Sequence, residues 1–263
     1  MLKYNPDISW QDLAAQFIDT GELDPVYVAL HRCNMPEDML MRWCAAFVTY
    51  YHMGTACKMC EYKGNKFWYE LLMAYDTAPR ATERRHFRGE AGRKALQRWW
   101  LDYSEPEKFF AACMQPSFMK LLNKNIPQVG TYFTWKCMDL REAVFGYDVD
   151  WTGSEKHLVT SPKQGMQIIF PELAEQPNPD YAEALHRVVD GIKHLKAPPR
   201  RVRSCGIAEA ETVCCGAKQY YKNKTAVGHD ILQKRAALQG YGDIAEHILS
   251  FMPEEPFDIE IVS

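Results

Sequence analysis

The chain has 263 residues, of which 47% are hydrophobic and 13% aromatic, and its formal net charge is −3. This composition excludes intrinsic disorder and allows a sizeable core, in one large domain or in two closely packed ones. No run of the sequence approaches the about 18 apolar residues of a membrane span, and the first residues are not typical of a secretory signal. Nine cysteines without a secreted-type framework fit reduced thiols, so we expect a cytoplasmic protein with no membrane partner.

Apolar residues at helical spacing run through most of the chain. Near the start, Leu13, Phe17 and Ile18 share one face of a segment that follows Ser9, a good helix cap. Strand-like patterns are confined to residues 166–170 and 259–262. The 3.6-residue spacing predicts further helices over 36–51, 67–73, 94–103, 105–113, 132–145, 181–195, 206–220, 230–239 and 244–251. The sequence therefore predicts an all-α, or at least mostly α, fold.

The domain organisation is less clearly marked. No clean linker, internal repeat or low-complexity tract divides the chain, and the three prolines of residues 171–179 mark only a hinge or a surface loop. We expect residues 1–263 to form a single helical domain, or two intimate helical lobes with the site between them.

Residues 80–98 form a strongly basic segment, in which seven Lys or Arg stand against two Glu. Arg84, Arg85 and Arg88 lie close together within it. Arginine binds phosphate oxygens through two parallel hydrogen bonds, so such a cluster is typical of a site for a phosphorylated ligand or a DNA backbone. A solvated helix face with internal ion pairs is the alternative.

A second basic zone covers residues 193–224, for which an ordinary exposed loop is an equally good interpretation. Lys218 differs from the other basic residues because it lies inside an uncharged stretch, residues 212–221. A lysine in apolar surroundings has a lowered pKa or meets an anion there. Lys218 is therefore a candidate for a direct role in a site.

The segment Ile126-Pro127-Gln128-Val129-Gly130 reads as a tight turn between two helices. A glycine such as Gly130 can adopt φ > 0, and the exposed backbone N–H groups of such a turn can bind a phosphate. Asp148 and Asp150 follow one helix later, where their carboxylates can face a ligand held by the turn. A DNA backbone is the obvious candidate.

Metal and nucleotide motifs are weak or missing. Cys57 and Cys60 have the spacing of a zinc knuckle, but no second matching pair follows at a suitable distance. The sequence has no G-x-x-x-x-G-K-[ST] loop, no G-x-S-x-G and no H-E-x-x-H. We predict neither a metal site nor a cofactor.

Two resemblances bear on function. The hairpin at residues 126–130, followed by 145–150, resembles the hairpin and downstream aspartate of the helix-hairpin-helix DNA glycosylases. Gln128 stands where that family has its first glycine, and Thr131 and Tyr132 occupy the region of its lysine, with Lys136 coming later. The resemblance implies a glycosylase-like helical architecture, DNA binding, and a role for Asp150.

A closer resemblance covers residues 82–89, 130–136, 211–218 and 227–230. These segments are similar to the phage amino acid:DNA transferases, also described as α-glutamyl/putrescinyl-thymine pyrophosphorylases. The resemblance implies an enzyme of phage thymine hypermodification. Its substrate would be 5-(pyrophosphoryloxymethyl)uracil in DNA, and an amine from glycine, another amino acid or a polyamine would displace pyrophosphate.

That reaction needs cations for the leaving pyrophosphate, a base for the attacking amine, and contacts to the DNA. We expect the following residues to supply the cations and the base: Arg84, Arg85, Arg88 and Lys218 for the pyrophosphate, and Asp150, Asp148 or His157 for the proton. We expect the DNA phosphates to be bound at Gly130, Thr131, Tyr132 and Lys136. Tyr132, Trp99 and Trp135 can stack a flipped base, with core packing as the alternative for each.

A DNA glycosylase that uses Asp150, or a non-catalytic DNA-binding module, are the rival interpretations. The sequence leaves open which amine is used, which carboxylate acts as the base, whether the base is flipped, whether DNA is read sequence-specifically, and the oligomeric state.

Overall fold

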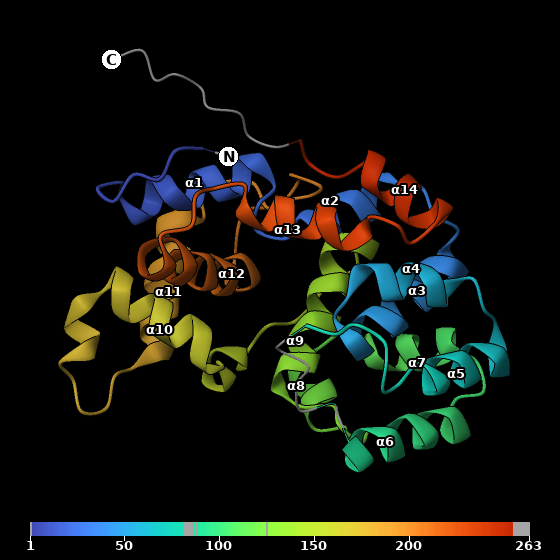
Figure 1. Ribbon diagram of the computed structural model, residues 1–263. Coiled ribbons are helices and arrows are strands. Elements are labelled where there is room, and N and C mark those ends of the chain that lie inside the picture. Colours follow the sequence, from blue (N-terminus) through green and yellow to red (C-terminus); the bar gives the residue numbers. More distant parts are fainter. Residues whose placement is uncertain (1, 82–86, 88, 125, 255–263) are drawn as a thin grey trace. The chain divides into compact units, whose positions relative to one another are not determined.

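The computed structural model describes residues 2–81, 87, 89–124 and 126–254 (Figure 1). Throughout these ranges the regular structure is helical, and the only β-type pairings are two isolated bridges. The all-α prediction is confirmed. The described residues divide into two compact units, which are taken in turn.

The first unit contains the described residues of 2–31, 151–234 and 252–254. Its helices are α1 (Trp10–Thr20), α2 (Pro25–Arg32), η3 (Ser154–His157), α10 (Thr160–Ile169), η4 (Pro171–Ala174), α11 (Tyr181–Ile192), α12 (Ile207–Ala217), η5 (Lys218–Lys222) and the first part of α13 (His229–Leu238). α10 and α12 pack closely, because a Cβ atom added at Gly165 would lie 1.9 Å from the carbonyl oxygen of Cys214. Residues 166–169 belong to α10 and not to a strand, so the strand prediction for 166–170 is wrong. The pattern 259–262 lies outside the described residues.

One buried carboxylate holds the first unit together across a long sequence separation. Glu22 follows α1 and accepts hydrogen bonds from the backbone N–H groups of Asp230 (2.8 Å) and Ile231 (3.2 Å) at the start of α13. The side chain is only 6% exposed. Burial raises the pKa of Glu22 from 4.5 to about 7, and the nearby Asp230 carboxylate adds to the rise, although the two backbone bonds oppose it.

The second unit contains residues 32–150 and 235–251, as far as they are described. Its helices are α3 (Glu37–Tyr50), α4 (Met53–Cys60), α5 (Gly64–Met73), α6 (Gly89–Asp102), α7 (Pro106–Cys113), α8 (Phe118–Leu122), α9 (Thr131–Asp139), η2 (Leu140–Phe145) and α14 (Asp243–Ser250). α3 contacts α4, α7 and α9, so it is the central helix of this unit. Its core includes a column of stacked rings. Phe87 and Trp99 lie 5.4 Å apart at 12°, and Trp99 and Phe109 lie 4.7 Å apart at 29°.

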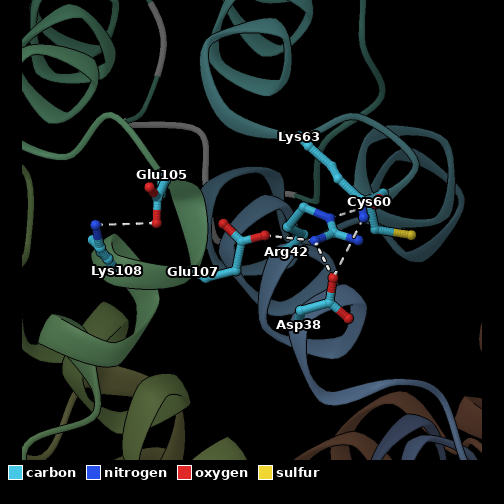
Figure 2. Close-up of polar contacts among 7 residues, drawn as sticks. All are labelled: Asp38, Arg42, Cys60, Lys63, Glu105, Glu107 and Lys108. Atoms are coloured by element: carbon cyan, nitrogen blue, oxygen red, sulfur yellow. Dashed lines mark hydrogen bonds and ion pairs between the residues drawn. The ribbon is translucent and has the colours of Figure 1, made fainter.

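A buried arginine ties three helices of the second unit together (Figure 2). Arg42 on α3 is 1% exposed. Its guanidinium donates to the carbonyl oxygen of Cys60 on α4 (2.8 Å), to Asp38 one turn earlier (2.9 Å) and to Glu107 on α7 (2.5 Å). Hydrogen bonds to several partners satisfy the buried charge, so this cluster is a structural clamp.

The helices that the periodicity misses are short or buried on nearly every side. α2 and α4 bury most of their side chains, so no polar face marks their period. α8 has only five residues. The pattern over residues 132–145 predicts one helix, whereas the structure has α9 followed by the π-helical turn η2. Apolar spacing cannot distinguish these two hydrogen-bond patterns.

Candidate active-site elements

The segment Ile126 to Gly130 forms a β-turn that leads directly into α9. The Val129 N–H donates to the carbonyl oxygen of Ile126 at 3.2 Å, with Pro127 and Gln128 between them. Gln128 has φ 61°, so the turn is of type II, in which the third position takes a left-handed conformation. Gly130 has φ −100° and does not use the freedom of a glycine. The expectation that Gly130 supplies the positive φ is wrong: the position that favours glycine is occupied by Gln128.

The turn presents several unused backbone donors. The N–H groups of Gln128, Gly130 and Thr131 have no hydrogen-bond acceptor within the part of the chain that the structure describes. The space around Gly130 is open, because a Cβ atom added there would meet nothing within 4 Å. Free amides at the start of a helix, with room beside them, are suited to bind a phosphate. Tyr132 lies in the first turn of α9, half-buried and edge-on to Tyr51 at 5.4 Å.

Asp150 is connected to the same region through its backbone. Its N–H donates to the carbonyl oxygen of Pro116 (2.8 Å). Its carbonyl oxygen accepts from the N–H of Phe118, the first residue of α8 (3.1 Å). α8 packs against α9, so the turn and Asp150 belong to one local assembly. The guanidinium of Arg141 donates to the carbonyl oxygen of Asp148 at 2.9 Å. The side chains of Asp148 and Asp150 are both exposed.

Lys136 is buried on α9 and does not lie at the surface of the turn. Its ammonium group donates to Asp139 at 2.8 Å, and both side chains are buried. The sequence predicts Lys136 as a DNA-phosphate ligand, and the structure places its charge on an internal carboxylate. Trp99 and Trp135, which were considered as stacking partners for a flipped base, are 0% and 2% exposed and belong to the core. Of the three aromatic candidates, Tyr132 has an accessible part.

The predicted pyrophosphate ligands Arg84, Arg85 and Arg88 lie outside the described residues. The described residues before them, and Phe87 between Arg85 and Arg88, make contacts with the core. The Ala81 N–H donates to the carbonyl oxygen of Tyr50 (3.1 Å). The Arg80 guanidinium lies over the rings of Tyr50 and Tyr75, 5.0 and 4.7 Å from their centroids. Phe87 is buried and stacks on Trp99.

In the first unit, Lys218 begins the π-helical turn η5. It is partly buried, and its amine lies 3.4 Å from the hydroxyl of Ser161 on α10. π-Helical turns are frequent at functional sites. His157 ends η3 and is half-buried. The nearby basic zone is partly engaged in the fold: Arg201 binds Asp19 and Arg203 binds Glu209.

Charged side chains are buried on two helices that lead into π-helical turns, a feature that the predictions from sequence do not include. α9 buries Lys136 and Asp139, and α12 buries Glu209 and Glu211. The available signal was a charged residue at positions where the helical period expects an apolar one. Burial of a charge is costly without partners, so such positions mark structural or functional polar contacts.

The Cys57–Cys60 pair makes internal contacts. The Trp43 indole donates to Cys57 at 3.3 Å, and the Cys60 thiol donates to the Cys57 carbonyl oxygen at 3.1 Å. Burial raises the pKa of Cys57 to about 12. Over the described ranges, no group of three or more His, Cys, Asp or Glu side chains is arranged to hold a metal ion. Among the same residues, no helix is both long and apolar enough to cross a membrane.

Comparisons with known proteins agree with the closer resemblance. The family model "Amino acid:DNA transferase" matches residues 10–225. A putrescinyltransferase of Delftia phage PhiW-14 is 30% identical, over 93% of this chain and 83% of that protein. A glycinyltransferase of Pseudomonas phage PaMx11 is 25% identical, over 95% of this chain and 96% of that protein. The chain belongs to the amino acid:DNA transferase family and is an enzyme.

Proposed function

We propose that this enzyme transfers an amine from an amino acid or a polyamine to 5-(pyrophosphoryloxymethyl)uracil in phage DNA. One observation carries the proposal, in a chain of the amino acid:DNA transferase family. The turn before α9 has backbone amides without an acceptor in the described residues, and α9 packs against α8, which contacts the backbone of the exposed Asp150. The names of the two relatives, a putrescinyltransferase and a glycinyltransferase, support both kinds of donor. The host cytoplasm, which holds the phage DNA, is the proposed place of action.

The proposed reaction is a substitution at the exocyclic methylene carbon of the base. The amine nitrogen forms a bond to this carbon, the carbon–oxygen bond to pyrophosphate breaks, and its electron pair leaves with the pyrophosphate. The attacking amine must be neutral, so a base has to remove its proton. Asp150 is the proposed base, with Asp148 and His157 as the alternatives. A carboxylate at this position also stabilises positive charge that develops on the methylene carbon and the ring.

The proposed DNA contacts lie at the start of α9. The amides of Gly130 and Thr131 would bind a backbone phosphate, and Tyr132 would contact the neighbouring nucleotide. Lys136 would reach a phosphate only by leaving Asp139, so we rank it below the amides.

The proposed pyrophosphate ligands are basic residues singled out by the sequence pattern. They are Arg84, Arg85, Arg88 and Lys218. Guanidinium groups suit the oxygens of a leaving pyrophosphate because they bind two at once. Phe87, which lies between Arg85 and Arg88 in the sequence, supports the assignment. Its ring stacks on Trp99, and the Trp99 indole N–H donates to the carbonyl oxygen of Pro127 in the turn.

The test uses a DNA duplex that contains the pyrophosphorylated base, incubated with the enzyme and either glycine or putrescine. The DNA is then digested to nucleosides for mass spectrometry, and free pyrophosphate is measured. An amine-modified nucleoside, with one pyrophosphate released per adduct, supports the proposal. Abasic sites would instead assign a DNA glycosylase, and unchanged DNA with every donor would assign a non-catalytic DNA-binding module.

A further inference from the structure

Trp99 is a buried residue that contacts the DNA-binding turn through a single polar atom. Its indole N–H donates to the carbonyl oxygen of Pro127 at 3.0 Å. The ring is 0% exposed and is fixed between Phe87 and Phe109. Phe133 on α9 lies 5.9 Å away, so one ring touches both the turn and the helix that follows it.

The contacted carbonyl belongs to the peptide group that decides the type of the turn. Types I and II differ in the orientation of the peptide between the second and third positions, here Pro127 and Gln128. Proline suits the second position of both types, whereas type II places the third residue at positive φ, which disfavours glutamine. Nothing in the sequence of the turn therefore favours type II. The observed φ of 61° at Gln128 needs an external cause, and the Trp99 hydrogen bond supplies one.

The same bond sets the direction of a free donor. In a trans peptide the C=O and N–H groups point in opposite directions. With the Pro127 carbonyl oxygen turned toward the buried indole, the Gln128 N–H points away from the core. This N–H has no acceptor in the part of the chain described, and the Gln128 side chain is exposed. A type I turn would rotate the peptide and withdraw the donor.

We propose that Trp99 is a positioning residue that selects the type II form of the turn and so aims the Gln128 N–H at a DNA phosphate. It acts through Pro127 and touches neither DNA nor the reacting atoms. The inference rests on the proposed function, because it takes DNA as the ligand of the turn.

The main experiment compares Trp99→Phe with Trp100→Phe in the full chain. Phenylalanine keeps an aromatic ring in the stacked column, removes the N–H donor and leaves a small cavity that lowers the Tm. Trp100 is a matched control on the same helix, since its indole N–H donates at 2.9 Å to the exposed side chain of Asn65 on α5. Trp99→Phe should raise the KM for modified DNA about tenfold, as expected for the loss of one charge-assisted hydrogen bond, with kcat within about twofold. Trp100→Phe should change neither.

A rescue variant separates positioning from simple destabilisation. Glycine takes the third position of a type II turn without strain, so Gln128→Gly should restore the KM of the Trp99→Phe variant while its lowered Tm stays low. An unchanged KM in Trp99→Phe, or a raised KM that Gln128→Gly does not lower, would overturn the inference.

A measurement on the wild-type protein needs no variant and no catalysis. Unmodified duplex DNA is titrated while the backbone amides of the turn are followed by NMR. The Gln128 N–H resonance should shift strongly and the inward-directed Val129 N–H only weakly. A Gln128 resonance that does not move would sink the inference. Absence of amine transfer by the wild-type enzyme, by contrast, would remove the proposed function and leave this titration to decide the role of the turn.

Discussion

α9 and α12 share two structural features and differ at their first residues. Each buries charged side chains and runs into a π-helical turn. At the start of α12, the Gly206 N–H donates to Glu209 (2.8 Å), which Arg203 holds by two hydrogen bonds (2.9 and 2.7 Å). At the start of α9, the amides of Gly130 and Thr131 have no acceptor in the described residues.

The difference shows which of the two helix starts can take a ligand. At α12 a carboxylate of the protein already occupies the place that an external anion would take. The start of α13 is closed in the same way by Glu22. At the start of α9 no carboxylate of the described residues takes this place, and α9 packs against α8, which contacts the backbone of Asp150. A helix start therefore indicates an anion site only when the protein does not fill it with its own carboxylate.

The largest effect is expected from a change at Asp150, the proposed base. Asp150→Asn keeps the size and the backbone contacts of the residue and removes the proposed base. The rate of amine transfer should fall by about 10² to 10⁴-fold. The Kd for DNA should stay nearly unchanged, because the amides at the start of α9 remain. Single-turnover kinetics and a binding titration on the same preparation check both parts, and full activity would disqualify Asp150 as the base.

A matched pair of variants tests the contrast between the two helix starts directly. A methyl group meets nothing within 4 Å at either Gly130 or Gly206, and neither residue has a positive φ. Alanine should therefore leave the Tm almost unchanged at both positions. Gly130→Ala should weaken DNA binding about tenfold, since the methyl group would enter the space of the bound phosphate. Gly206→Ala should not affect binding, and equal Kd values for the two variants would break the comparison.

Glu22, which binds the backbone N–H groups at the start of α13, should make the stability of the protein depend on pH. The pKa of Glu22 is raised to about 7 in the folded protein, so the native state binds its proton more tightly than the unfolded state. The associated stability is complete below about pH 4.5 and is lost as the pH rises through 7. The free energy of unfolding should fall by on the order of 1–3 kcal/mol across this window. Urea unfolding at pH 5 and pH 8 should show this slope in the wild type and a flatter one in Glu22→Gln.

The smallest expected effect concerns the closed start of α12. Glu209→Gln weakens the pairing with Arg203, which is itself partly exposed. The loss of stability should be about 1 kcal/mol, measured by urea unfolding, with no change in the Kd for DNA. A clear loss of DNA affinity would indicate that the start of α12 also takes part in binding.

The sequence predicts the amphipathic part of this fold well, because apolar spacing reports one-sided burial directly. α1, α3, α11 and α14 follow the predicted segments closely. The prediction is wrong at the end of α10, where residues 166–169 form a short, mostly apolar run that suggests a strand. α2 and α4 have only eight residues each and bury most of their side chains, so a short apolar run is all that marks them in the sequence.

The assignment of the site to the turn and Asp150 stays a prediction. The structure connects the two through α8, which contacts the backbone of Asp150 and packs against α9. The conformation of Gln128 depends on the indole N–H of Trp99, which is distant in sequence, so no local pattern reveals it. Likewise the burial of Lys136 and its contact with Asp139 follow from tertiary packing around α9.

The central claim is tested most directly with a donor that carries a ¹⁵N label at its amine. Wild-type enzyme and Asp150→Asn are each given the same pyrophosphorylated DNA, and the digested nucleosides are weighed by mass spectrometry. We predict that the wild-type enzyme places the label on the modified thymidine and releases one pyrophosphate per label, while the variant is far slower. Unlabelled nucleosides after full incubation of the wild-type enzyme, with or without abasic sites, would contradict the account.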